Sequence, residues 1–183
     1  MVRLINSVIS ICVTWLKLGL LKLFHGSHIK YCFIERFSPN VDVVLENGGS
    51  ARFGNRVRIH SGSKLRSVGK GVLTFEDNVH LNYNCMVVCH ESITIGAGTT
   101  IGPSVMIYDH DHDFSEAIDE SHYKTAPVAI GKNCWIGANA IILRGSEIGD
   151  GCVIAADTVV KGKFPAGSLV YNKRETVCRP LNK

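Results

Sequence analysis

Large aliphatic residues recur at every sixth position through the C-terminal part of the chain, and this period constrains the fold more than any other feature. The unbroken series is Ile130, Ile136, Ile142, Ile148, Ile154 and Val160. A smaller residue follows four places after each of the first five, at Cys134, Ala140, Ser146, Cys152 and Thr158. A helix repeats every 3.6 residues and a half-buried strand every two, so neither explains a period of six. A chain that turns a corner every six residues does explain it, with the aliphatic side chains inside a three-sided coil.

The same period runs through the preceding part of the chain in a weaker form. Its three series are Ile95, Ile101 and Ile107; Phe75, Leu81 and Val87; and Phe53, Ile59 and Leu65. The smaller inner positions beside the last two series are Val57, Ser63, Val79 and Cys85. The register slips between Leu65 and Phe75 and between Val87 and Ile95. We predict that each slip is a loop insertion at a corner of the coil.

Composition indicates one globular domain. The chain has 183 residues and 45% hydrophobic content, which is enough for a core of its own. Its net charge of +4 is modest and dispersed, so nucleic-acid binding is not expected. The seven cysteines are odd in number and lack CxxC spacing. Neither a disulfide framework nor a zinc ribbon is therefore predicted, and a reducing cytoplasm fits best.

The N-terminal segment is apolar but interrupted by cations. Its longest uncharged run, from Leu4 to Leu16, is too short to span a bilayer, and no clean signal-peptide cleavage site follows. Lys17 and Lys22 within an apolar helical pattern indicate an amphipathic helix. The helix either packs on the main domain or a partner subunit, or it lies on a membrane surface.

Between Ile107 and Ile130 the period is interrupted by a polar stretch that contains alternating acids and histidines. His110 and His112 alternate with three aspartates, Asp109, Asp111 and Asp113. The pattern is compatible with a metal site, with a catalytic base and its orienting acids, or with a solvated loop. A long excursion from a regular solenoid is often functional, so we expect a protruding loop over residues 109–127.

The repeat and three stretches of sequence resemble the hexapeptide-repeat acyltransferases. The stretches are IGPSVMIYDHDHDF, APVAIGKNCWIGANAIILRGSEIGDGCVIAADTVV and FPAGSLVY. They are most similar to the branch of galactoside and maltose acetyltransferases and of O-antigen, colanic-acid and capsule O-acetyltransferases. The resemblance implies an all-β solenoid, a left-handed parallel β-helix with one long extruded loop, and this handedness is an exception to the usual crossover rule. The expected divisions are a helical segment over 1–36, the β-helix over 37–170 and a tail over 171–183.

The resemblance also implies an acetyl-CoA-dependent O-acetyltransferase in which one histidine is the general base. In galactoside and maltose acetyltransferases the catalytic histidine lies five places after the inner aliphatic residue that precedes the loop. Counting from Ile107 without a gap gives His112, and a gap of two gives His110. Asp109, Asp111 and Asp113 are then orienting acids or ligands of the acceptor sugar, and at least one of them is expected to be simply exposed. An imidazole near its ordinary pKa can take a proton from an attacking hydroxyl and return it to the leaving thiolate.

The family's remaining site residues map onto two further regions. An asparagine that holds the acceptor maps onto Asn82, with Asn84 two places beyond it. The family's acidic position is occupied by His90, which is either a ligand of the sugar or a surface residue. Asparagine is also common at corners for hydrogen-bonding reasons alone. Trp135 would line the cleft near the acceptor and the thioester. The positions that would hold coenzyme A are Trp135, Gly137, Ala138, Ala155, Ala156 and Lys161, with Lys163, Lys173 and Arg174 as candidates for its phosphates. Because YNKRETVC replaces the family's usual Gly-x-Pro-Ala turn, the adenine end of the site is expected to differ.

The resemblance implies a homotrimer with active sites between subunits. The expected acceptor is a sugar of a surface polysaccharide or its precursor, modified in the cytoplasm or at the inner face of the membrane. One alternative is a metal-dependent hydratase of the γ-carbonic anhydrase type, since His90 and His110 are about one coil apart and that class binds its metal with three histidines. A noncatalytic scaffold and an acetyltransferase for another small acceptor are further alternatives. The favoured interpretation expects no metal.

Overall fold

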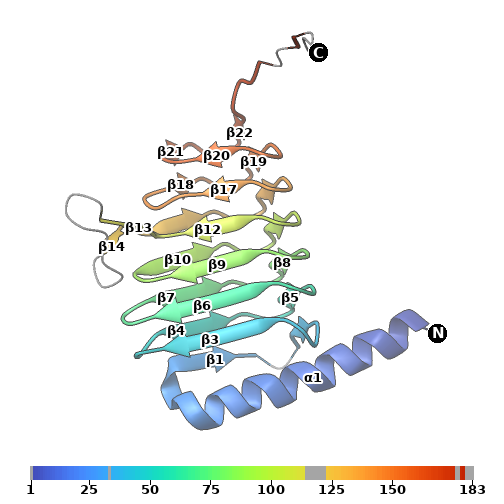
Figure 1. The fold of residues 1–183 in the computed structure, drawn as a ribbon. Coiled ribbons are helices and arrows are strands. Elements are labelled where there is room, and N and C mark those ends of the chain that lie inside the picture. The colour runs from blue at the N-terminus through green and yellow to red at the C-terminus, as the bar shows by residue number, and fades with distance from the viewer. Residues whose placement is uncertain (1, 33, 114–122, 176–177, 180–183) are drawn as a thin grey trace.

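Three parallel sheets form the faces of a triangular prism, seen from the side in Figure 1. The computed structural model describes residues 2–32, 34–113, 123–175 and 178–179. Face 1 contains β1 (Ile29–Tyr31), β4 (Ser50–Phe53), β7 (Val72–Phe75), β10 (Ser92–Ile95), β15 (Val128–Ile130), β18 (Glu147–Ile148) and β21 (Lys163–Phe164). Face 2 contains β2 (Arg36–Phe37), β5 (Arg58–Ile59), β8 (His80–Leu81), β11 (Thr100–Ile101), β16 (Trp135–Ile136), β19 (Val153–Ile154) and β22 (Leu169–Val170). Face 3 contains β3 (Asp42–Glu46), β6 (Lys64–Val68), β9 (Met86–Cys89), β12 (Met106–Tyr108), β17 (Ile141–Ile142) and β20 (Val159–Val160). The expected left-handed parallel β-helix is confirmed.

The interior of the prism is the column of residues that the six-residue period predicts. The six aliphatic residues from Ile130 to Val160 are each at most 3% exposed, and the upstream series are buried as well. The smaller inner residues from Cys134 to Thr158 are also buried. Each inner residue pairs with its counterpart one coil away, as Ile136 does with Ile101 and Ile154. The aliphatic side chains therefore stack into one continuous dry core.

Coil length varies, and the extra residues all lie at the corner between face 3 and face 1, which we call the insertion corner. The number of residues between successive strand partners on face 3 gives the length of each coil. These partners are, in order, Asp42, Lys64, Met86, Met106, Ile141 and Val159. The first two coils have extra residues around Asn47 and Gly69, and a shorter insertion follows Cys89. The predicted insertions are confirmed, and they share one edge of the prism.

The β-helix begins earlier than the predicted boundary at residue 37. Its first coil already includes β1 and β2, and Ile29 is fully buried. The buried position before Phe37 is occupied by Glu35, which is 0% exposed. A carboxyl group at an inner position breaks the apolar pattern, so the period could not reveal this coil.

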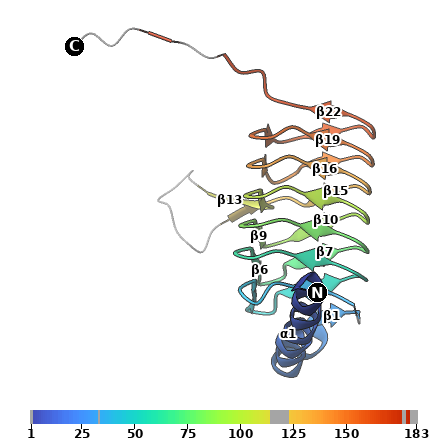
Figure 2. The same cartoon turned by 90° about the vertical axis from the view of Figure 1, so that its right-hand side faces the viewer.

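Helix α1 (Val2–His25) runs beneath the first coil, followed by the 3₁₀ turn η1 (Gly26–His28); Figure 2 looks almost along α1. Leu18 and Thr14 are fully buried, and Thr14 Oγ1 accepts a hydrogen bond of 2.8 Å from the Phe37 amide. The lysines of α1 also face the β-helix: Lys17 donates to the carbonyl of Pro39 at 3.1 Å, and Lys22 to that of Ile29 at 2.9 Å. Packing on the main domain is therefore confirmed.

The outward face of α1 is apolar. Its exposed large side chains are Val8, Ile9, Trp15, Leu16, Leu20, Leu23 and Phe24. By length and composition alone, the segment Val8–His28 is long and apolar enough to cross a membrane, which the shorter uncharged run did not predict. The difference arises because the uncharged run ends at Lys17, whereas the longer segment remains apolar on average with both lysines included.

Candidate functional site

A two-stranded hairpin leaves the β-helix at the insertion corner. Its strands β13 (His110–His112) and β14 (Tyr123–Thr125) are antiparallel, with His110 opposite Thr125 and His112 opposite Tyr123. The chain rejoins the coil at Ala126, whose amide donates to the carbonyl of Asp109 at 2.9 Å. The excursion expected between Ile107 and Ile130 is confirmed at both ends, while residues 114–122 lie outside the described part of the chain.

Asp109 anchors the hairpin to the coil below. Its side chain is 0% exposed, and its two oxygens accept hydrogen bonds from the amides of His90, Glu91 and Ser92 at 2.8, 2.8 and 2.9 Å. Burial alone would raise the pKa of this carboxyl. The hydrogen bonds from His110 and from the His90 and Glu91 amides outweigh burial and hold the pKa below its ordinary value. A fully covered carboxylate has no surface to offer a sugar, so its geometry favours the orienting role over the acceptor-ligand role.

His110 lies in a cluster of rings above the same corner. Its Nδ1 is 3.3 Å from Asp109 Oδ1, and its side chain is 13% exposed. The ring centroids of His90 and His110 are 4.0 Å apart, and that of Tyr123 is 4.4 Å from His90. Burial, followed by the neighbouring His110, lowers the pKa of His90. His90 therefore supports the hairpin from below, at the position where the family places an acid.

His112 is the exposed histidine of the hairpin. Its ring centroid is 4.9 Å from that of Tyr123, on the adjacent strand. The count that selects His112 depends on Ile107 being the inner residue before the loop. Ile107 is fully buried and pairs with Val87 and Ile142 on the neighbouring coils. The starting point of the ungapped count is therefore an inner position of the coil.

Asp111 connects the hairpin to the coils above it. Its Oδ2 is 2.5 Å from Arg144 Nε and 3.9 Å from Lys161 Nζ. Arg144 and Lys161 follow β17 and β20 closely, so this acid ties the loop to face 3. Lys161, expected near coenzyme A, thus lies on the hairpin side of the prism.

The two candidate asparagines occupy different environments. Asn84 sits at a corner with a positive φ of 56°, and its amide donates to the carbonyl of Ser61 at 3.0 Å. This geometry favours the corner interpretation of Asn84. Asn82 is half-buried, and its Oδ1 accepts a hydrogen bond of 2.9 Å from the Tyr83 amide. The Asn82 side chain lies directly after β8, at the edge of face 2.

Five of the expected coenzyme A positions meet at one corner, between face 2 and face 3. Trp135 is 59% exposed on the outside of β16. Gly137 and Ala138 follow β16, and Ala155 and Ala156 follow β19 one coil away. A Cβ atom on Gly137 would lie 2.4 Å from the Ala156 nitrogen, so only glycine permits this spacing of the coils. Gly137 is buried beneath the next coil, whereas Ala138 and Ala155 are half-buried and Ala156 is exposed.

The remaining candidate cations are dispersed. Lys163 Nζ pairs with Glu147 at 2.8 Å on the adjacent strand of face 1. Arg174 donates to the carbonyl of Asp157, and Asn172 accepts a 2.6 Å hydrogen bond from the Val159 amide. These contacts fold the first part of the tail onto the last coils, and Lys173 is exposed between them.

Within the described residues, no group of three or more His, Cys, Asp or Glu side chains is arranged to hold a metal ion. His90 and His110 stack against each other, while His112 projects from the outer end of β13. The geometry of the single subunit therefore gives the metal-dependent hydratase no support.

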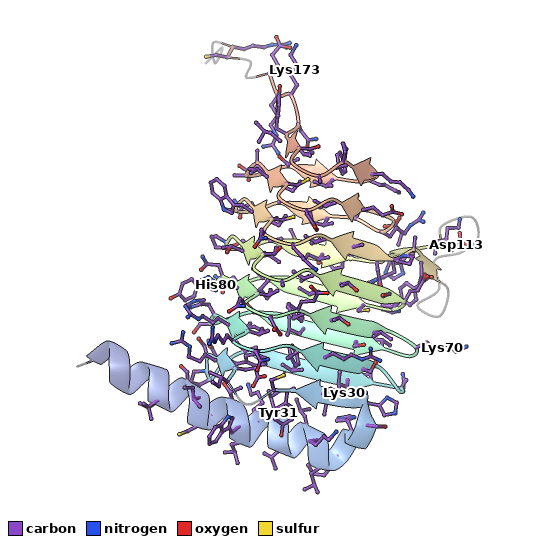
Figure 3. The ribbon with its side chains drawn as sticks, turned by 180° about the vertical axis from the view of Figure 1, so that it is seen from behind. Lys30, Tyr31, Lys70, His80, Asp113 and Lys173 are labelled. Carbon is purple, nitrogen blue, oxygen red and sulfur yellow. The ribbon has the colours of Figure 1, made fainter. Side chains whose placement is uncertain are left out.

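The hairpin and the candidate acceptor residue lie on opposite edges of the subunit. Figure 3 labels His80, two residues before Asn82, and Asp113, one residue after His112, on the two sides of the prism. His80 belongs to face 2, whereas the hairpin leaves the insertion corner between face 3 and face 1. One subunit alone does not bring His112 and Asn82 together.

The sequence interpretation missed a basic column on the outside of face 2. Arg36 pairs with Arg58, and Arg58 pairs with His80, on three successive coils. The ring of His60 contacts those of His80 and Tyr83, with centroids 4.9 and 4.7 Å apart. The signal that could have found the column is the equal spacing of Arg36, Arg58 and His80 along the chain.

Comparisons with known proteins agree with the fold. The family model described as bacterial transferase hexapeptide (six repeats) matches residues 127–162. The chain is 34% identical over 161 residues to the putative lipopolysaccharide biosynthesis O-acetyl transferase WbbJ of Escherichia coli K12, covering 82% of this chain and 80% of that protein. Nodulation protein L of Rhizobium leguminosarum bv. viciae is 49% identical over 92 residues, covering 49% of this chain and 48% of that protein.

Among solved structures, the fold is similar to that of AntD, an N-acyltransferase from Bacillus cereus in complex with dTDP-4-amino-4,6-dideoxyglucose and coenzyme A. The TM-score is 0.66 at 24% identity, and the match covers 80% of this chain and 79% of that one. At this identity the likeness establishes the shared β-helix.

Proposed function

Because the chain belongs to the hexapeptide-repeat acyltransferases, we propose that it moves an acetyl group from acetyl-CoA to a sugar hydroxyl of a surface polysaccharide or its precursor. The observation that carries this proposal is the 34% identity to a putative lipopolysaccharide biosynthesis O-acetyl transferase over four-fifths of both chains. In this proposal the histidine hairpin would supply the base, and the corner formed by Gly137, Ala138, Ala155 and Ala156 would supply the groove for the thioester.

We assign the general base to His112. It is the exposed imidazole of the hairpin, and it occupies the family's catalytic position when the chain is counted from the buried Ile107. The imidazole takes the hydroxyl proton as the sugar oxygen attacks the thioester carbonyl. When the carbon–sulfur bond breaks, the imidazolium returns that proton to the departing thiolate. A backbone N–H at the cleft wall would stabilise the oxyanion formed between these steps.

His110 and Asp109 are positioning residues in this proposal. Asp109 fixes the root of the hairpin through three backbone amides, and His110 packs between Asp109 and His90. Asp111 restrains the other side of β13 through Arg144. The base is thus presented from a strand that Asp109, before it, and Asp111, within it, connect to the β-helix.

The acceptor and coenzyme A are proposed to bind between subunits of a homotrimer. His112 of one subunit would face Asn82 and Trp135 on face 2 of the next, because these residues lie on opposite edges of a single subunit. Coenzyme A would lie along the corner formed by Gly137, Ala138, Ala155 and Ala156, where Ala156 is exposed and Ala138 and Ala155 are half-buried. A cyclic trimer makes three equal sites of this kind.

We further propose that α1 lies on the inner surface of the membrane. Its lysines, together with Thr14, bond to the β-helix, so a helix that crossed the bilayer would have to give up these contacts. Its opposite face presents Leu16, Leu20 and Phe24 outward. A surface helix buries such a face at the headgroup boundary.

The proposal is tested by measuring thiol release from acetyl-CoA with a panel of sugars and lipid-linked sugars. We expect acceptor-dependent release that falls by at least roughly a hundredfold in His112→Ala, the usual size of a general-base contribution. His110→Ala is expected to retain more activity, and His28→Ala, on η1, serves as a matched control. If His110→Ala abolishes release and His112→Ala does not, the base assignment is wrong. If no sugar acceptor stimulates release, the proposed function is wrong.

A further inference from the structure

The lower end of face 2 contains a pocket lined by three arginines. Arg36 and Arg58 are strand partners on β2 and β5, and Arg56 lies on the corner before β5. With Ile11 of α1 and Ile34 they enclose about 280 Å³. Ligand pockets usually begin near 300 Å³, so the volume suits a compact group rather than a whole sugar nucleotide.

Arg56 adopts a backbone conformation that its residue type does not favour. Its φ is +59°, in the left-handed region. The residues stacked above it on the same corner are Asn78, Gly98, Asn133, Gly151 and Gly167. Asparagine and glycine accept this conformation at low cost, whereas a long side chain is uncommon there. An arginine at such a position, below asparagine or glycine on every coil above it, indicates a role for its side chain.

Two of the three arginines, Arg56 and Arg58, carry charge that no ion pair among the described residues neutralises. Burial, followed by the like charge of Arg58, lowers the pKa of Arg36. Burial and then Arg58 also lower the pKa of His60 on the same side. Because Arg56 and Arg58 line one pocket, their two charges form a site for an external anion.

We propose that Arg36, Arg56 and Arg58 bind the phosphate or diphosphate group of a phosphate-bearing sugar acceptor. Guanidinium groups pair with phosphate oxygens through two parallel hydrogen bonds, and several of them suit an anion with more than one charge. The identification of the anion as part of the acceptor depends on the proposed function, whereas the anion site itself does not.

The position of the pocket fits an acceptor that extends along face 2. Strand pairing continues from Arg58 through His80 and Thr100 to Trp135. Neighbouring strands are about 4.8 Å apart, so Arg58 lies roughly 14 Å below Trp135. Asn82 follows the His80 strand between these levels. A phosphate held by the arginines would leave the attached sugar beside Asn82 and below the thioester corner.

Direct binding of inorganic pyrophosphate to the full-length protein, measured by titration calorimetry, tests the site without acetyl transfer. We expect saturable binding that weakens as salt increases, and a loss of roughly tenfold or more in Arg58→Ala. Arg56→Asn should weaken binding without lowering the melting temperature, because asparagine suits the backbone there. Arg52→Ala, an exposed arginine on face 1, is the matched control and should bind normally. No binding by the wild type, or equal binding by Arg58→Ala, overturns the proposal.

Kinetics with paired acceptors then distinguish the source of the phosphate. A nucleotide-linked sugar and a lipid-linked sugar diphosphate in detergent micelles are each compared with the free sugar. For the phosphate-bearing acceptor that the enzyme uses, the KM should rise in Arg58→Ala with little change in kcat. The KM for the free sugar should stay constant in the same variant. If pyrophosphate binds but no acceptor is acetylated, the anion site stands and the proposed function fails. If sugars are acetylated and the phosphate gives no advantage, the proposed function stands and the acceptor assignment fails.

Discussion

The pKa values of two buried carboxyl groups are shifted in opposite directions because their hydrogen bonds differ. Asp109 accepts three backbone amides and contacts His110, and its pKa is lowered. Glu35 accepts a 2.6 Å bond from the Cys32 amide, while its Oε2 is buried without a partner among the described residues. Burial raises the pKa of Glu35 to about 7, against hydrogen bonds that act in the other direction. Asp109 is therefore charged at neutral pH, whereas Glu35 titrates there.

Glu35→Gln should remove a component of the pH dependence of stability. The pKa of Glu35 is about 7 in the folded chain and 4.5 for an ordinary glutamate, so folding favours the protonated form. Its stabilising contribution is complete below pH about 4.5 and is lost as the pH rises through about 7, by up to roughly 3 kcal/mol.

The check is denaturant unfolding of both proteins at a fixed concentration between pH 4.5 and 8. The unfolding free energy of the wild type should fall relative to that of the variant across this range. Because His60, His80 and His90 titrate in both proteins, they cancel in the difference. A difference that does not change with pH contradicts the assignment to Glu35.

At the scale of elements, the coils and the connections between them have separate tasks. The coils repeat one inner column, and this column fixes the three faces. The insertion corner has the residues that vary in number and carries both the hairpin and His90 beneath it. Helix α1 closes the open lower end, where Thr14 supplies an acceptor for the Phe37 amide.

The apolar face of α1 leads to a prediction about membrane binding. Leu16→Glu combined with Leu20→Glu should reduce co-sedimentation with anionic vesicles by at least roughly tenfold, since each leucine contributes about 1.5–3 kcal/mol when buried. Leu169→Glu, an equally exposed leucine on β22, is the control and should bind like the wild type. Release of the wild type by an alkaline carbonate wash is expected of a surface helix. Resistance to that wash would indicate a helix that crosses the bilayer.

The repeat could be predicted from the sequence because every inner position faces the same apolar column. The residues that become neighbours on adjacent coils could not be predicted, because coil length changes from one coil to the next. Arg36, Arg58 and His80 are equally spaced along the chain, but this spacing identifies them as neighbours only once the length of the first coils is known. The first coil was concealed for a different reason, because Glu35 occupies one of its inner positions. The histidines of the hairpin were visible as a motif, but their separation into a packed His110 and an exposed His112 required the strand pairing.

At the scale of the whole molecule, the candidate base and the candidate acceptor residue face away from each other. His112 is presented at the insertion corner and Asn82 at the edge of face 2. A site that uses both must be assembled from two copies. Catalysis in the proposed function therefore depends on subunit concentration as well as on the fold.

Mixed trimers test this dependence. His112→Ala and Asn82→Ala are each expected to be nearly inactive alone. Co-expressed in equal amounts, they should regain roughly a quarter of the wild-type activity, because one site in four would combine an intact His112 with an intact Asn82 from the neighbour. Size-exclusion chromatography with light scattering verifies three copies per particle. Activity equal to the sum of the two separate variants would place both residues in one subunit's site.

Because all the extra residues lie at one corner, the residues that carry the chemistry can change without changing the β-helix that supports them. A deletion or insertion there changes the length of one coil, as the residues after Glu46, Val68 and Cys89 already do, while the ladders on the three faces continue unchanged. The hairpin is accordingly a replaceable segment on a constant β-helix. A new acceptor preference could be acquired by replacing this hairpin, without any compensating change in the column of buried aliphatic residues.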